Sequence, residues 1–141
     1  MKILVAVDGS DFTKRMLAYW VTHDEWLGAD HAYTVLTVVP TVPARAALVL
    51  DRAALQAYYA DEGEKILHPI REFLDQRNLA ATFLSKTGSS VGEVIAKTAE
   101  SEGFNLILLG SHGHGALSGL VLGSVASHVL AGCKTPVLII R

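Results

Sequence analysis

Short runs of apolar residues, separated by turn-forming residues, recur along the chain and predict five buried strands. Lys2–Val7 is rich in Ile, Leu and Val with little polar alternation, which is typical of a strand covered on both faces of a parallel sheet. Four later segments have a similar character, and they are Tyr33–Val39, Ala81–Lys86, Asn105–Leu109 and Pro136–Ile140.

Apolar residues spaced three or four positions apart predict helices between these strands. The predicted helices are one capped by Ser10 or Asp11 and ended by Gly28, one from Asp51 to about Arg77, one capped by Ser89 or Ser90, and one from Gly119 to about Gly132. Pro69 lies inside the second helix and is expected to kink or split it. The pattern does not settle the form of residues 41–50.

Strict alternation of strands and helices predicts an α/β fold: a doubly wound, mostly parallel five-stranded sheet with helices on both faces. A length of 141 residues without a linker, repeat or low-complexity segment favours one domain over residues 1–141.

Composition and charge narrow the classes of partner. The net charge of -2 and the pI of about 6.3 favour neither nucleic acid nor an anionic membrane. Cys133 is the only cysteine, which excludes an intrachain disulfide and fits a reducing compartment. Gly103–Cys133 carries no Lys, Arg, Asp or Glu, but its apolar runs are too short for a membrane span. We therefore expect a cytoplasmic protein.

A glycine-rich segment, Gly110-Ser111-His112-Gly113-His114-Gly115, follows the fourth predicted strand and precedes a helix. Ligands of doubly wound sheets bind outside the carboxyl ends of the strands. Glycines let the backbone approach a phosphate closely, and the next helix offers its free N–H groups and dipole. Since the segment has no Lys or Arg, backbone amides and hydroxyl groups would hold the phosphates, with or without a divalent cation such as Mg²⁺.

Other chemistries fit the residues less well. Gly132-Cys133-Lys134-Thr135 lacks the first glycine of a Walker A loop, and the first predicted strand is not followed by a dinucleotide fingerprint. His112 and His114 have the spacing of a chelating pair, but no third metal ligand is evident. Ser111, His112 and Asp8 are the residue types of a catalytic triad, but Ser111 does not lie in a G-x-S-x-G elbow. No catalytic residue is predicted.

The spacing Gly110, two residues, Gly113, nine residues, Gly123-Ser124 resembles the phosphate loop of ATP-binding universal stress proteins. The resemblance extends over the whole chain, through the opening Ile-Leu-Val-Ala-Val-Asp-Gly-Ser, through Gly88 and through the ending Thr-Pro-Val-Leu-Ile-Ile. It implies an adenine nucleotide alpha hydrolase-like fold and ATP or AMP as the ligand.

The resemblance also implies roles for particular residues. Ribose and phosphates would meet Gly110, Gly113, Gly123 and Ser124, together with the neighbouring Val125. Asp8 would lie beside the nucleotide, and the backbone of Val7 and of Val38 or Val39 would bracket the adenine. His112 stands where many relatives carry Arg, so its phosphate contact would be weaker and more dependent on pH. Relatives commonly dimerise through the last strand, which predicts a homodimer.

Three functions follow as alternatives. The first is an adenine-nucleotide-binding regulatory or stress-response protein, in which the nucleotide biases the conformation or the partner surface. The second is a slow ATP hydrolase that uses the same loop. The third is an interaction protein whose cleft holds no nucleotide.

Overall fold

The structure is a computed structural model that describes residues 1–115, 119 and 121–141. The elements in chain order are β1 (Lys2–Ala6), α1 (Asp11–Thr22), α2 (Asp24–Leu27), β2 (Ala32–Pro40), α3 (Ala44–Ala47), α4 (Arg52–Asp75), β3 (Thr82–Gly88), α5 (Val91–Ser101), β4 (Leu106–Gly110), α6 (Ser124–Gly132) and β5 (Val137–Ile140).

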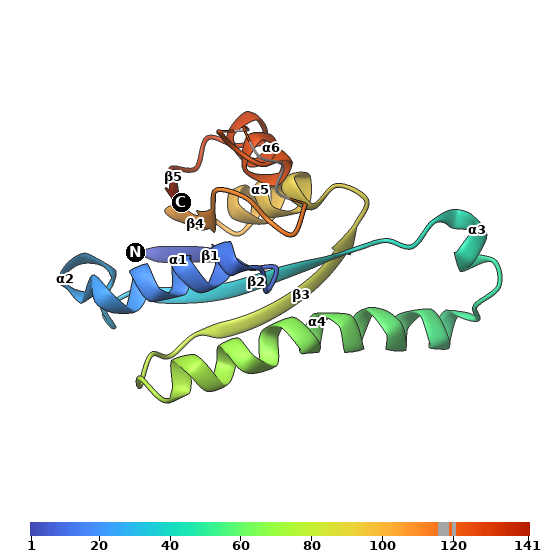
Figure 1. The fold of residues 1–141 in the computed structure, drawn as a ribbon, viewed down its shortest axis with the longest axis horizontal. Coiled ribbons are helices and arrows are strands. Elements are labelled where there is room, and N and C mark those ends of the chain that lie inside the picture. Colours follow the sequence, from blue (N-terminus) through green and yellow to red (C-terminus); the bar gives the residue numbers. More distant parts are fainter. Residues whose placement is uncertain (116–118, 120) are drawn as a thin grey trace.

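The strands form one sheet in the order β3-β2-β1-β4-β5, and every neighbouring pair is parallel. Helices α1 and α4 lie on one side of this sheet, and α5 and α6 lie on the other (Figure 1). The predicted fold class, a doubly wound parallel sheet with helices on both faces, is therefore confirmed.

Strand β1 shows why its sequence is apolar at nearly every position. Ile3 and Val5 belong to the core beneath α1 and α4, whereas Leu4 and Ala6 belong to the core beneath α5 and α6. Alternate side chains point to opposite faces of a strand, so a central strand covered on both sides needs apolar residues throughout.

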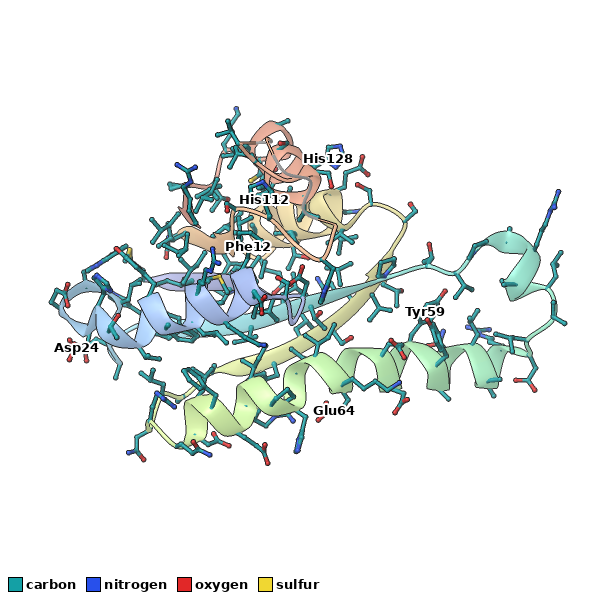
Figure 2. All side chains as sticks on the ribbon, in the orientation of Figure 1. Phe12, Asp24, Tyr59, Glu64, His112 and His128 are labelled. Carbon is teal, nitrogen blue, oxygen red and sulfur yellow. The ribbon has the colours of Figure 1, made fainter. Side chains whose placement is uncertain are left out.

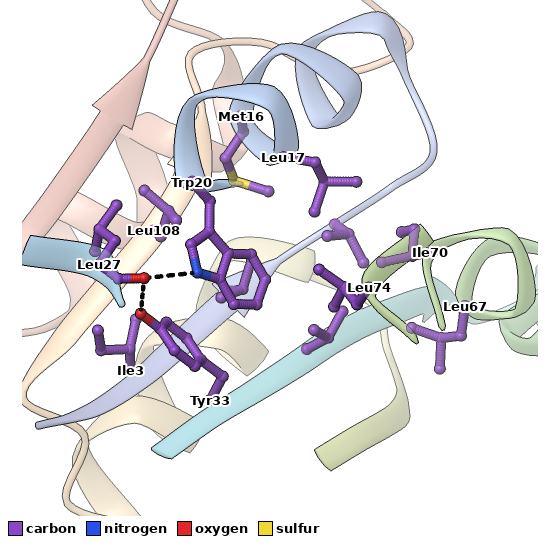
Figure 3. Close-up of a cluster of buried hydrophobic side chains, with 13 residues drawn as sticks. Ile3, Met16, Leu17, Trp20, Leu27, Tyr33, Leu67, Ile70, Leu74 and Leu108 are labelled. Carbon is purple, nitrogen blue, oxygen red and sulfur yellow. Dashed lines mark hydrogen bonds between the residues drawn. The ribbon is translucent and has the colours of Figure 1, made fainter. Parts of the chain in front are cut away.

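Trp20 anchors α1 at the end of the sheet where β2 begins (Figure 3). Its side chain is fully buried, and its indole Nε1–H donates to the Leu27 carbonyl at 3.2 Å. The hydroxyl of Tyr33 donates to the same carbonyl at 2.5 Å. Both polar atoms of these aromatic rings are thus satisfied inside the core, which fixes α1 relative to β2.

Several predicted boundaries are wrong. The first helix ends at Thr22 rather than Gly28, because the N–H of His23 turns back to the Trp20 carbonyl and the separate short helix α2 follows. The last helix begins at Ser124 rather than Gly119, because Gly123 has extended backbone and donates its N–H to the Ser111 carbonyl at 2.8 Å. Part of the predicted helix, 120, lies outside the described residues.

Two further features of the chain concern α3 and α4. Residues 41–50 contain the short helix α3, on the arm that projects beyond the sheet (Figure 1). Helix α4 continues through Pro69 without a break, so the predicted split is wrong. Pro69 and Lys65 are both exposed, so water can replace the missing N–H donor for the Lys65 carbonyl.

No helix in the described part of the chain has both the length and the apolar character that a membrane crossing requires.

Candidate functional site

A cavity of about 650 Å³ opens at the carboxyl ends of β1, β2 and β4. From β1 the chain proceeds outward to β2 and β3, and then crosses to β4 on the other side of β1. The strand order therefore reverses between β1 and β4, which is where doubly wound sheets bind their ligands. The residues that line the cavity include Ala6, Val7, Asp8, Thr13, Leu36, Val38, Pro40, Glu62, Ile66, Val91, Ile95, Leu109, Gly110, His112, Gly113, His114, Gly115, Gly123, Ser124, Val125 and Ala126.

The N-terminus of α6 forms one wall of this cavity. Ser124, Val125 and Ala126 are the first three residues of the helix and all line the cavity. The first intrahelical bond runs from the N–H of Ser127 to the Gly123 carbonyl, and Gly123 supplies no side-chain cap. The N–H groups of the first turn therefore have no acceptor within the helix, and the positive end of its dipole faces the cavity. This wall can bind an anion.

Asp8 follows β1 and is held in one orientation. Its Oδ1 accepts hydrogen bonds from the Ser10 N–H and from the Thr13 hydroxyl, both at 2.9 Å. The Asp8 N–H in turn donates to the Thr13 hydroxyl at 3.1 Å. Asp8 is therefore a turn-stabilising carboxylate as well as part of the cavity wall, and its Oδ2 faces Gly113. A ligand hydroxyl is the natural donor for such an oxygen.

The glycines of the loop are required by the protein's own packing. A Cβ atom on Gly110 would lie 2.8 Å from the Phe12 Cβ, and one on Gly113 would lie 2.5 Å from the Asp8 Oδ2. A Cβ on Gly123 would lie 3.1 Å from the His112 Cα. We expected these glycines to leave space for phosphates, but protein atoms already fill the space beside them. Only Gly115, among these four, has open space around a Cβ.

His112 and His114 have different positions in the loop. The His112 ring packs against Phe12, with centroids 5.1 Å apart (Figure 2), and its Nδ1 lies 3.0 Å from the Ser111 hydroxyl. The His114 Nε2 lies 2.6 Å from the Asp8 carbonyl and ties the loop to the end of β1. His112 therefore lines the cavity with its ring held by neighbours, and His114 connects the two strand ends.

Neither a catalytic triad nor a histidine metal site is assembled here. Ser111 is 1% exposed, so a substrate cannot reach its hydroxyl. The Asp8 carboxylate bonds to Ser10 and Thr13 rather than to His112. Within the described residues, no three His, Cys, Asp or Glu side chains gather closely enough to hold a metal ion.

The aliphatic end of the cavity lies between β1, β2 and α5. Of the two valines expected to bracket adenine from β2, Val38 lines the cavity, whereas Val39 is buried outside it. Val7 also lines the cavity, but its N–H is used by the sheet, because it donates to the Leu36 carbonyl at 2.9 Å.

The sequence patterns did not predict the part of the cavity wall that α4 and α5 contribute. Glu62 and Ile66 come from α4, and Val91 and Ile95 come from α5. Ile66, Val91 and Ile95 also pack against the hydrophobic cores, and no local motif marks any of the four as a cavity residue. Thr13 is a further cavity residue, and for it the sequence does carry a signal. A hydroxyl residue five positions after an Asp at the end of a strand can form a side-chain hydrogen bond across the turn, as Thr13 does with Asp8.

Comparison with known proteins agrees on one family. The model of the universal stress protein family matches residues 1–141. Universal stress protein YxiE of Bacillus subtilis is 28% identical over 148 residues, which cover 99% of this chain and 98% of that protein. The solved structure of protein MJ0577, from Methanocaldococcus jannaschii, has a TM-score of 0.77 at 25% identity and covers 99% of this chain and 94% of its own.

A more distant structure extends the likeness in fold. It is that of a universal stress protein family protein of Arabidopsis thaliana, crystallised with AMP bound, at 15% identity and a TM-score of 0.68. The match covers 99% of this chain and 90% of the plant chain.

Proposed function

The chain belongs to the universal stress protein family, and we propose that it binds an adenine nucleotide, ATP or AMP, in the cavity at the carboxyl ends of β1 and β4. The observation that carries the proposal is the N-terminus of α6, which has no side-chain cap from Gly123 and lines a cavity of about 650 Å³ at the reversal of strand order. The bound AMP of the Arabidopsis relative supports adenine nucleotides as the class of ligand.

In the proposed complex, the phosphates lie against the first turn of α6. The N–H groups of Ser124 and Val125 donate to phosphate oxygens, and the exposed Ser124 hydroxyl adds a further donor. Gly110, Gly113 and Gly123 shape the loop beside them, and the His112 ring borders the same space. The ribose hydroxyls donate to Asp8, and the adenine lies between the aliphatic residues at the ends of β1 and β2, Val7 and Val38.

The charged residues that line the cavity favour different binding conditions for ATP and AMP. Two carboxylates, Asp8 and Glu62, line the cavity, whereas no Lys or Arg is among its described lining residues. Because ATP carries more negative charge than AMP, it needs a divalent cation such as Mg²⁺ to enter this environment, and AMP does not.

The proposed role is nucleotide sensing by a cytoplasmic regulatory protein that acts as a homodimer. Strand β5 is an edge of the described sheet, with its four apolar residues half-buried. An apolar edge strand is a site for pairing with a second copy about a two-fold axis. Hydrolysis is not part of the proposal.

Two substitutions at Ser124 test the proposal by calorimetry with AMP. Ser124→Pro removes both the backbone N–H and the hydroxyl, while proline is well tolerated at the first position of a helix. Ser124→Ala removes the hydroxyl alone. We expect the proline variant to weaken AMP binding about tenfold and the alanine variant to weaken it less.

The matched control is Ser127→Ala, which changes a serine of the same helix that bonds to the Gly123 carbonyl and does not line the cavity. It should leave AMP affinity unchanged. A Ser124→Pro protein that folds and binds AMP as tightly as the wild type would refute the α6 assignment.

A further inference from the structure

A second cavity, of about 390 Å³, lies between α1 and α4 and adjoins the proposed nucleotide cavity. Its walls are mainly apolar side chains of the two helices: Leu17, Ile66, Pro69, Ile70 and Phe73. We call this cavity the α1–α4 slot. Its polar end consists of Asp8, Gly9, Thr13 and His114, three of which, Asp8, Thr13 and His114, also border the nucleotide cavity.

Two lysines at the slot are already paired with acids of their own helices. The Lys14 ammonium lies 3.4 Å from the Asp11 carboxylate, and the Lys65 ammonium lies 2.8 Å from Glu62. The carboxylate of Glu62, together with that of Asp61, raises the pKa of Lys65 above its ordinary value. The lysines therefore contribute their aliphatic stems to the slot, while their charges are compensated on the exposed surface.

Asp8 differs from these acids. Its Oδ1 accepts hydrogen bonds from two neutral groups, the Ser10 N–H and the Thr13 hydroxyl, and it has no ion pair with any described residue. The slot thus combines apolar walls with one carboxylate that has no cationic partner in the part of the chain that the structure describes. Charge complementarity at this end favours a cationic head group.

We propose that the α1–α4 slot binds a primary alkylamine, with its apolar chain between α1 and α4 and its ammonium group against Asp8. The apolar chain gains from removal of its surface from water, and the ammonium supplies three donors. An alkyl carboxylate would instead place its charge beside Asp8. The slot shares Asp8 with the nucleotide cavity, but its apolar walls are formed by α1 and α4, and its occupation does not require a nucleotide.

Methyl-detected NMR of the nucleotide-free protein tests this proposal with three ligands of equal chain length. The ligands are hexylamine, which is protonated at neutral pH, 1-hexanol and hexanoate. We expect shifts at the methyl groups of Leu17 and Ile70, which line the slot, but not at Ile95, which lines the nucleotide cavity alone. The affinity for hexylamine should exceed that for hexanoate about tenfold, with hexanol between them.

Matched variants separate the charge of Asp8 from that of its neighbours. Asp8→Asn should make hexylamine and hexanol bind equally, whereas Asp30→Asn, which changes an exposed acid outside the slot, should preserve the preference for the amine. Lys14→Ala combined with Lys65→Ala should leave the order of the three ligands unchanged. Lys97→Ala, at an exposed position on α5, controls for loss of a lysine.

Three results would overturn the proposal. They are equal or tighter binding of hexanoate to the wild type, shifts confined to Ile95, and the absence of binding by all three ligands. Because the titrations use protein without nucleotide, they remain informative if AMP does not bind. Conversely, failure of the alkylamine to bind leaves the nucleotide proposal untouched.

Discussion

Replacing Gly113 by alanine tests whether the loop after β4 and the Asp8 turn form one unit. The new Cβ would lie 2.5 Å from the Asp8 Oδ2, so the carboxylate must move. Its Oδ1 would then lose the hydrogen bonds from the Ser10 N–H and the Thr13 hydroxyl. Hydrogen bonds to a charged group contribute about 1.5–3 kcal/mol each, and partial relaxation leaves an expected loss of about 2 kcal/mol in the free energy of unfolding.

Urea unfolding and AMP calorimetry measure the two consequences of the Gly113→Ala substitution. Since Asp8 is proposed to accept a ribose hydroxyl, AMP affinity should fall about tenfold as stability falls. The control is Gly115→Ala, two residues later in the same loop, where a Cβ meets nothing within 4 Å. It should leave the free energy of unfolding unchanged, which separates the clash with Asp8 from the mere addition of a methyl group to the loop. A Gly113→Ala protein with wild-type stability and affinity would show that Asp8 moves without cost, and the reasoning would be wrong.

Three further predictions concern stability and assembly. Thr37 is 1% exposed and its hydroxyl has no hydrogen-bond partner among the described residues, so Thr37→Val should raise the free energy of unfolding by about 1 kcal/mol in urea titrations. Burial raises the pKa of the Tyr33 hydroxyl above its ordinary value of 10.0. The neutral hydroxyl therefore contributes to the free energy of unfolding below a pH of about 10, and this contribution is lost as the pH rises through the folded-state pKa. Tyr33→Phe should therefore flatten the alkaline loss of stability, and an unchanged slope would assign that loss elsewhere. Ile140→Lys should convert the proposed homodimer to a monomer in sedimentation, because it places like charges near the two-fold axis of paired β5 strands; a monomeric wild type at micromolar concentration would contradict the dimer.

The fold was predictable because a central parallel strand must be apolar at successive positions. The order of apolar runs and helical periodicities was enough to define the class of sheet, as the cores on either side of β1 show. Helix ends were not predictable in the same way. The apolar spacing continues from Trp20 to Leu27 across the end of α1, because Leu27 is buried by α2 and not by a continuation of the first helix.

The candidate site was predictable only where it is local in sequence. Asp8, Gly110 and Ser124 follow strands or begin a helix, and their positions could be inferred from the order of elements. Glu62 and Ile66 reach the cavity from α4, more than 50 residues after Asp8, and only the packing of that helix on β2 and β3 brings them there. The sequence also could not show why Gly110 must be a glycine. The atoms that exclude a side chain there belong to Phe12, almost 100 residues earlier in the chain.

The central claim is that the first turn of α6 binds the phosphate of an adenine nucleotide. The most direct test is an AMP titration followed through the backbone amide resonances of the assigned protein. The account predicts that the N–H groups of Ser124, Val125 and Ala126 show the largest shifts, because these residues line the cavity and their N–H groups have no acceptor within the helix. Saturating AMP that leaves these three resonances unmoved, or that shifts only residues of the α1–α4 slot, would contradict it.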